Sequence, residues 1–242
     1  MPIHVYIMSA DFAACAPAQR ERELLPQLHS EEQARYHAFK HARRRQTWLA
    51  GRALLLAALK QHLHHVDATA LRTDTQGAMR YGDGRVHVSL SHSGDLLAVA
   101  LSGMPVGVDI EWPRPRACVA QAQGLFSDVE ARYLYSLPKS EWQTAFYTLW
   151  TLKEAAAKAA GLSMWDSLRN TEFDPRRGQF ALRAPFPAVS WSCVHAGIEP
   201  GWRLAVAAAG LDALSKMKCW RRDTGGHWQR QSLQQPMLLQ LR

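Results

Sequence analysis

Hydrophobic and polar positions along the first half of the chain predict short strands around one long helical stretch. Ser30, followed directly by two acids, predicts a helix N-cap, and apolar positions at helical spacing continue to about His62. Short apolar segments bounded by turn residues predict strands at His4–Met8, Val86–Leu90, Leu96–Leu101 and Val106–Glu111. The last three segments follow one another closely, which favours a small antiparallel meander.

The second half of the chain shows a similar order of elements without repeating the sequence. Ser127 and Glu130 have the spacing of a capping box. A second long helix is predicted over Ser140–Gly161, because apolar positions recur at helical spacing and Gly161 is placed as a C-cap. Strand candidates follow at Thr171–Phe173, Gln179–Leu182, Val189–Val194 and Trp202–Ala208.

These elements predict an α+β fold with two halves, each a long helix beside short, mostly antiparallel strands. We expect a first domain over residues 1–112 and a second over residues 117–215. The segment 112–116 between them contains two prolines, which cannot continue a central strand. Residues 216–242 are Gln-rich, basic and weakly periodic, so we expect a tail or a loosely packed arm there.

Composition narrows the class of protein. The chain has 242 residues, of which 47% are hydrophobic, and this excludes a disordered chain. No uncharged apolar stretch reaches the roughly 18 residues of a membrane span. The four cysteines lie far apart without a C-x-x-C pair, and no basic segment opens a secretory signal. We therefore expect a cytoplasmic protein.

The formal net charge of +8 is unevenly distributed. Gln33–Arg52 contains six basic residues and no acid, so one face of the first helical stretch is strongly positive. Residues 216–242 contain six basic residues against Asp223 alone, and the rest of the chain is mildly acidic. An anionic ligand or partner is the physical match for such a surface.

Candidate metal ligands lie in the last strand of the meander. Because strand side chains alternate between faces, Asp109 and Glu111 point the same way, and Val106, Val108 and Ile110 point into the core. Neighbouring carboxylates repel each other unless a cation lies between them, and oxygen ligands of this kind favour Mg²⁺ or Mn²⁺. The alternative is a solvated polar face on an edge strand.

The second long helix carries Glu154 and Lys158 on one face, with Lys153 on the flank. In a functional interpretation, Glu154 is a third metal ligand and both lysines bind phosphate. The alternative is an ordinary exposed ion pair on an Ala-rich helix. Upstream, Ser89–Gly94 ends a strand in a tight turn, where N–H groups and hydroxyls can face an anion.

Four segments in this order resemble the 4'-phosphopantetheinyl transferases of the surfactin-synthetase-activating (Sfp) type. They are RRRQTWLAGR at 43–52, VSLSHS at 88–93, VGVDIE at 106–111 and WTLKEAAAK at 150–158. The motifs of serine hydrolases, zincins, P-loop proteins and Rossmann folds do not occur in the sequence.

The resemblance implies a monomeric pseudo-dimer with coenzyme A in the cleft between its two similar halves. It implies Mg²⁺, or Mn²⁺ in its place, bound by Asp109, Glu111 and Glu154. The residues implied to contact the coenzyme are Arg43, Arg45, Arg52, Arg80, Ser89, Ser91, His92, Lys153 and Lys158.

The resemblance also implies the reaction and the partner. A serine of an acyl or peptidyl carrier protein attacks the phosphorus that bears the pantetheine arm, and 3',5'-ADP leaves. Glu154 is the candidate for activating the serine, and Asp109 and Lys158 complete the implied catalytic group. The stretch after Gly161 helps to dock the carrier in this family. Neither a membrane nor nucleic acid is expected as a partner.

The loop before the serine-histidine strand departs from the family pattern. The family usually has Gly-Lys-Pro there, whereas this chain has Gln76–Arg80, so Arg80 is the candidate to replace the missing lysine. Separately, Asp166-Ser167-Leu168 matches the attachment motif of a carrier protein. No small acidic helical domain surrounds it, and we interpret the match as coincidence.

Two other functions stay open on the residues alone. One is a metal-dependent nuclease that would use the same acids with Lys153. The other is a non-enzymatic polyanion binder, because the C-terminal segment interleaves Trp220 and Trp228 with arginines.

Overall fold

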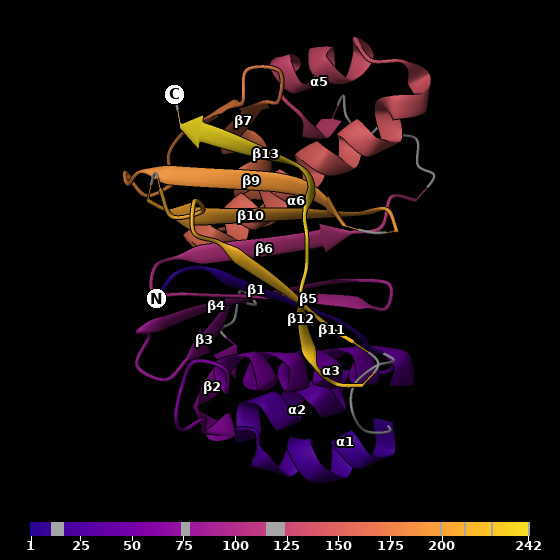
Figure 1. The fold of residues 1–242 in the computed structure, drawn as a ribbon, viewed down its shortest axis with the longest axis vertical. Coiled ribbons are helices and arrows are strands. Elements are labelled where there is room, and N and C mark those ends of the chain that lie inside the picture. Colours follow the sequence, from indigo (N-terminus) through magenta and orange to yellow (C-terminus); the bar gives the residue numbers. More distant parts are fainter. Residues whose placement is uncertain are drawn as a thin grey trace. The chain divides into compact units, whose positions relative to one another are not determined.

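The structure, a computed structural model, describes residues 1–10, 17–73, 78–114, 124–198, 200–210, 212–223 and 225–241. The chain folds as two compact units (Figure 1). Unit 1 comprises Met1–Met104 and Lys218–Gln231, and unit 2 comprises Pro105–Met217 and Ser232–Arg242. None of the helices in the described ranges combines the length and apolar character needed to cross a bilayer.

Unit 1 is a seven-stranded sheet with helices. The helices are α1 (Pro17–Leu24), α2 (Ser30–Ala38) and α3 (Ala42–Leu59), with 3-10 turns η2 (Leu25–Gln27) and η3 (Ala68–Ala70). The strands are β1 (His4–Ser9), β2 (Leu71–Thr73), β3 (Met79–Tyr81), β4 (Val86–Ser93), β5 (Leu96–Ser102), β11 (Lys218–Arg222) and β12 (Trp228–Arg230). The strand order is β12-β11-β1-β5-β4-β3-β2, antiparallel except between β1 and β11.

The long helical stretch predicted from Ser30 to His62 is two helices. The backbone is extended at Phe39, and α2 begins after His29, whose ring, rather than the Ser30 hydroxyl, accepts the capping bond from Glu31 N–H. The break exposes the Phe39 carbonyl, which accepts a hydrogen bond from Arg45 Nη1 at 2.9 Å. No Gly or Pro marks the break, so local sequence signals could not predict it.

Unit 2 is a six-stranded sheet with helices. The helices are α5 (Asp128–Tyr135), α6 (Trp142–Ala160) and α7 (Met164–Asn170), with the 3-10 turn η4 (Lys139–Glu141). The strands are β6 (Val106–Glu111), β7 (Thr171–Asp174), β8 (Gln179–Leu182), β9 (Trp191–Ile198), β10 (Trp202–Ala209) and β13 (Gln234–Leu241). The order is β6-β10-β9-β13-β8-β7, antiparallel except between β13 and β8.

Two local predictions in unit 2 are confirmed. The capping box of Ser127 and Glu130 begins α5, and both of its hydrogen bonds are present. The second long helix is α6, and it ends at Gly161, which adopts the left-handed conformation with φ 67°. The α+β class with mostly antiparallel sheets is therefore correct at the level of secondary structure.

The predicted domain limits are wrong in two places. Because β6 pairs with β10, unit 1 ends at Met104 rather than at residue 112. Residues 216–242 are not a tail: β11 and β12 extend the unit 1 sheet, and β13 lies between β9 and β8 in unit 2. Figure 1 shows this segment in yellow as ordered strands. Strand partners distant in sequence supply hydrogen bonds that a local pattern does not reveal.

Candidate functional site

The two predicted carboxylates of β6 lie on the face of the strand that packs under α6. A Cβ on Gly107 would lie 2.0 Å from the carbonyl oxygen of Ala155 and 2.5 Å from the backbone nitrogen of Ala159. Only glycine therefore permits this close approach of helix and strand. Because of the strand alternation, Asp109 and Glu111 share the Gly107 face.

The aliphatic residues of β6 are buried, as predicted. Val106, Val108 and Ile110 are buried, but on the opposite face of the strand, outside the hydrophobic core that lies beneath α6. The carboxylate face, rather than the aliphatic face, is the one that meets the helix. Asp109 is consequently 4% exposed, which excludes the alternative of a solvated polar edge for this residue.

Lys158, in the last turn of α6, is joined to β6 by two hydrogen bonds. Its Nζ donates to Asp109 Oδ1 at 2.8 Å and to the carbonyl oxygen of Val108 at 3.2 Å. The predicted alternative, an ordinary exposed pair of Glu154 and Lys158, does not describe this lysine. The closest carboxylate to its ammonium is supplied by the neighbouring strand.

Glu154 belongs to the same electrostatic cluster. Burial raises the pKa of Glu154; the Lys158 charge opposes this shift, and the charges of Asp109 and Glu111 add to it. For Lys158, burial lowers the pKa, but Asp109 and Glu154 outweigh it, and the net direction is upward. The structure thus brings together all four residues that the sequence assigned to metal binding and catalysis.

The donor chemistry of this cluster fits a hard divalent cation. Three carboxylates face one lysine, which leaves two excess negative charges for a cation to balance. Among the residues that the structure describes, no three His, Cys, Asp or Glu side chains are arranged so that they could hold a metal ion together. The Lys158 ammonium contacts Asp109 directly, so a cation bound there would share Asp109 with it or displace it.

Lys153 does not belong to this cluster, and its predicted role as a phosphate ligand is wrong. Its side chain is 0% exposed, and its Nζ lies 3.0 Å from Glu130 Oε1. The same ammonium donates to the carbonyl oxygen of Thr171 at 2.8 Å. A lysine ammonium so enclosed has no access to a coenzyme. It lies away from the cluster because one step along a helix turns the side chain by about 100° from that of Glu154.

The carrier-like motif is also explained by its burial. Ser167 is fully buried in α7, and its Oγ donates to the carbonyl oxygen of Lys153 at 2.7 Å. A modifying enzyme has no access to this hydroxyl. Coincidence is therefore the correct interpretation of Asp166-Ser167-Leu168.

In unit 1, Arg43 lies close to the turn that follows the serine-histidine strand. Its Nη2 is 2.9 Å from Oδ1 of Asp95, and Asp95 is three residues after His92. Arg43 is exposed in the first turn of α3, an 18-residue helix whose N-cap His41 makes no side-chain capping bond. Amide donors and guanidinium groups at a helix N-terminus form a common anion site.

The serine-histidine segment is strand rather than turn. β4 continues to Ser93, and the turn follows at Gly94 and Asp95. Ser89 and Ser91 are buried on one face of β4, whereas His92 is exposed on the other. The serines and His92 therefore do not act as one surface, because adjacent strand residues point to opposite faces.

The other predicted coenzyme residues of unit 1 have separate environments. Arg52 is buried and pairs with Glu32 at 2.9 Å, and its guanidinium stacks over Trp48 at 3.8 Å, so its predicted phosphate role is wrong. Arg45 is half-buried and holds the α2–α3 break. Arg80 is exposed on β3, where it pairs with His87 of β4. His87 is five residues before His92 on the same strand. This is about 16 Å along the strand, beyond the reach of one side chain.

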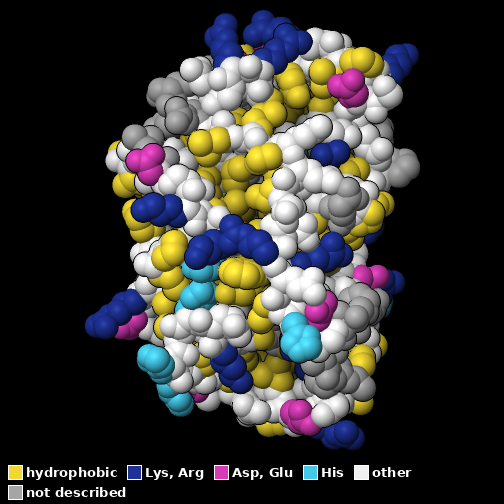
Figure 2. All heavy atoms as spheres, viewed as in Figure 1, with side chains coloured by type: hydrophobic (Ala, Val, Ile, Leu, Met, Phe, Trp, Pro, Cys, Tyr) yellow, Lys and Arg dark blue, Asp and Glu magenta, His cyan; other side chains and the backbone are white. Residues whose placement is uncertain are grey.

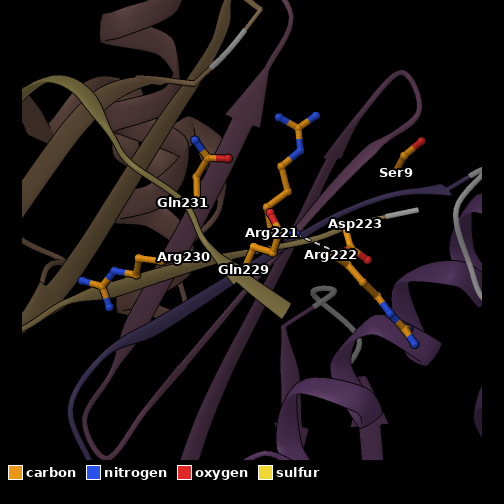
Figure 3. Close-up of a pocket in the computed structure, with 7 residues that line it drawn as sticks. All are labelled: Ser9, Arg221, Arg222, Asp223, Gln229, Arg230 and Gln231. Atoms are coloured by element: carbon orange, nitrogen blue, oxygen red, sulfur yellow. Dashed lines mark hydrogen bonds between the residues drawn. The ribbon is translucent and has the colours of Figure 1, made fainter. Parts of the chain in front are cut away.

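A pocket of about 340 Å³ lies beside the hairpin of β11 and β12 in unit 1. It is lined by Ser9, Arg221, Arg222, Asp223, Gln229, Arg230 and Gln231. Figure 3 shows that the three arginines point in different directions, and its dashed line joins Gln229 to Asp223. A single small anion would therefore not meet all three guanidinium groups.

The aromatic side chains of this hairpin are not a stacking platform for bases. Trp220 and Trp228 pack against the core of unit 1, and Arg230 and Arg222 lie over their rings at 5.4 and 5.6 Å. Figure 2 shows the Lys and Arg side chains of the viewed face in separate groups. These observations weigh against the alternative of a polyanion-binding arm, which needs exposed rings along a continuous basic track.

Sequence reasoning did not identify the partners of the buried cations. The sequence pattern marks Glu130 only as a capping residue and Glu32 only as a first-turn acid, yet each neutralises a buried cation. The pattern likewise marks Asp95, the partner of Arg43, only as a turn residue. Each acid had a sufficient local explanation, so no sequence signal pointed to its distant partner.

Comparison with known proteins places these motifs in one family. Residues 31–102 match the family model "4'-phosphopantetheinyl transferase N-terminal domain", and residues 105–207 match "4'-phosphopantetheinyl transferase superfamily". The boundary between the two matches falls where the structure separates its units, between Met104 and Pro105.

Individual relatives agree with the family models. The 4'-phosphopantetheinyl transferase HetI of Nostoc sp. is 30% identical over 208 residues, covering 81% of this chain and 84% of the relative. The 4'-phosphopantetheinyl transferase Sfp of Bacillus subtilis is 27% identical over 205 residues, covering 81% and 88%. AcpT of Salmonella typhimurium is 38% identical over 125 residues, covering 50% and 62%. With its carboxylate cluster on β6 and α6 and both family segments in order, the chain belongs to the 4'-phosphopantetheinyl transferases of the Sfp type.

Proposed function

We propose that this enzyme transfers the 4'-phosphopantetheine arm of coenzyme A to a serine of an acyl or peptidyl carrier protein. The Ser Oγ–P bond forms, the bond between that phosphorus and the ADP oxygen breaks, and 3',5'-ADP leaves. The observation that carries this proposal is the cluster of Asp109, Glu111, Glu154 and Lys158 in unit 2. It supplies a base for the serine proton and carboxylates that would hold a cation for phosphoryl transfer.

Within this cluster, Glu154 is the residue we propose as the proton acceptor. Its carboxylate belongs to the same charge cluster as Asp109 and Lys158, where it can take the serine proton directly or through water. Asp109, Glu111 and Glu154 would hold Mg²⁺, which supplies charge neutralisation at the phosphate oxygens. Lys158 is the residue of this cluster that we propose to bind the coenzyme's diphosphate.

In unit 1, we propose that Arg43 and His92 contact phosphate groups of the coenzyme. Both side chains are exposed. Asp95 pairs with Arg43 and follows His92 by three residues, so it connects Arg43 to the turn after His92. The family's pseudo-dimer is likewise our proposal for the whole chain. Its support is that each unit contains one long helix, α3 or α6, on a mostly antiparallel sheet.

For the carrier, we propose docking on α7, in the stretch after Gly161. Trp165 is 65% exposed, and Arg169, one helical turn later, is also exposed. Trp and Arg are residues that dominate binding energy at protein interfaces. α7 is fixed to α6 through Ser167, so a carrier bound there would be held close to the catalytic helix.

The test combines purified enzyme, coenzyme A, Mg²⁺ and an apo-carrier, followed by intact mass spectrometry of the carrier. We expect a mass gain of one phosphopantetheine arm with the wild type and its loss with Glu154→Gln. Glu141→Gln is the matched control, because Glu141 is exposed at the other end of the same helix. An unmodified carrier with the wild type, across acyl and peptidyl carriers, would refute the proposal.

A further inference from the structure

Lys153 is enclosed by α5, which precedes its own helix α6, and by α7 and β7, which follow it. Its ammonium contacts Glu130 Oε1 at 3.0 Å, the carbonyl oxygen of Thr171 at 2.8 Å and Thr171 Oγ1 at 3.0 Å. These contacts use the donors that a lysine ammonium offers. Both charged side chains are 0% exposed, so the pair is insulated from solvent.

Glu130 extends this connection to α5 and β7. Besides Lys153, its carboxylate accepts hydrogen bonds from the backbone N–H of Ser127 at 2.8 Å and of Phe173 at 2.9 Å. One carboxylate thus joins the start of α5, the middle of β7 and the side chain of Lys153. Charge-assisted bonds of this kind are stronger and more directional than neutral ones.

The backbone of Lys153 is held as well. Its carbonyl oxygen accepts the bond from Ser167 Oγ at 2.7 Å, and Thr171 Oγ1 donates to the carbonyl oxygen of Ser167 at 2.7 Å. On the other side of α6, the close approach of Gly107 holds the carbonyl of Ala155. Glu154 therefore lies between two residues whose positions are each determined by packing against other elements.

We infer that Glu130 and Lys153 are positioning residues that set the rotation of α6 about its axis and so aim Glu154 at Asp109. A small rotation of α6 would displace the Glu154 carboxylate while leaving the core largely intact. Misplacing a catalytic group by about 1 Å can cost about 100-fold in rate. A buried ion pair adds little net stability over apolar packing, so its directional contacts are the feature that apolar residues could not replace.

This inference rests on the proposed transferase function, and the test separates positioning from folding. The variants are Lys153→Met, Glu130→Gln, the double variant Glu130→Gln/Lys153→Met, and Ser167→Ala, which changes no charge. Arg85→Gln is the control, because Arg85 forms an exposed pair with Asp83 in unit 1. Thermal unfolding is measured for each, together with kcat and the KM for coenzyme A at saturating carrier.

Each single charge variant leaves one buried charge unpaired, so both should unfold at lower temperature. The double variant contains neither charge and should regain stability. Its kcat should stay at least about 10-fold below wild type, with KM for coenzyme A within about 2-fold, because positioning acts on the chemical step. Ser167→Ala should lower kcat by about 3-fold at nearly unchanged KM. Arg85→Gln should match the wild type.

A stable double variant with wild-type kcat would overturn the inference and leave the transferase function intact. The same holds if activity falls only in proportion to the folded fraction, or if KM rises while kcat is unchanged. An inactive wild type, by contrast, would overturn the proposed function and this inference with it.

Discussion

Lys158 Nζ lies 2.8 Å from Asp109 Oδ1 and connects the last turn of α6 to the strand that carries the candidate metal ligands. The pair brings a cation into a group of three carboxylates before any metal is present. Glu154, one helical turn before Lys158, is coupled electrostatically to the same aspartate.

We predict that Lys158→Met lowers kcat/KM for transfer by about 100-fold or more, because the variant loses a cation that balances phosphate charge. The melting temperature should fall, since Asp109 is left in a buried place without its ammonium. Added Mg²⁺ should then raise the melting temperature more in Lys158→Met than in the wild type, because the cation replaces the missing charge. Differential scanning fluorimetry measures both changes in melting temperature.

The control is Lys139→Met, because Lys139 is an exposed residue before α6. Equal responses to Mg²⁺ in wild type and Lys158→Met would contradict the shared site.

The contact of Gly107 with α6 predicts a severe effect of the smallest substitution. In Gly107→Ala, the methyl group would meet backbone atoms of Ala155 and Ala159, which cannot rotate away. The helix must move, and we expect a loss of about 3 kcal/mol or more in the free energy of unfolding. Urea unfolding measures this, and transfer activity should fall with it. Gly124→Ala is the matched control, because a Cβ there meets nothing within 4 Å; a similar loss in both variants would argue against the contact.

The packing of β13 predicts that residues 232–242 are required for folding. Leu239 is fully buried in the core of unit 2, and its neighbour Leu238 is 47% exposed on the other face of the strand. Leu239→Ala should lower the free energy of unfolding by about 2–5 kcal/mol, and Leu238→Ala by less than about 0.5 kcal/mol. Deletion of residues 232–242 should unfold unit 2, measured by circular dichroism and hydrogen exchange. Full activity after this deletion would show that β13 is dispensable.

The burial of His195 predicts that the free energy of unfolding decreases as the pH falls. Burial, and secondarily the Arg203 charge, lower the pKa of His195 from 6.5 to about 3. Below pH 6.5 the unfolded chain binds a proton that the folded chain excludes, so stability is full above that pH and falls by up to about 1.4 kcal/mol per pH unit. Urea unfolding at pH 7, 6 and 5 should show a smaller decline for His195→Leu than for the wild type. His65→Gln, on the surface, should follow the wild type; identical slopes for all three proteins would exclude His195 as the cause.

Much of the local structure could be predicted because its signals are local. The apolar spacing of Ser140–Gly161 and the C-cap glycine predicted α6 to within two residues at its start. The alternation around Asp109 correctly placed both carboxylates of β6 on one face, because side-chain direction in a strand is a property of the backbone. What the pattern could not show was which face meets the helix: both faces of β6 are buried, and the face with the carboxylates packs under α6.

The sequence by itself determined the family, the helical and strand periods, and the residues of the carboxylate cluster. Only the tertiary structure decided what its two lysines do. Lys153 and Lys158 stand in one motif of one helix, yet Lys153 is buried against Glu130 and Lys158 reaches Asp109. Tertiary structure likewise turned the apparent C-terminal tail into strands of both sheets. The physical reason is the same in both cases: a charge or a strand edge is stabilised by a partner distant in sequence, and that partner is present only once the chain has folded.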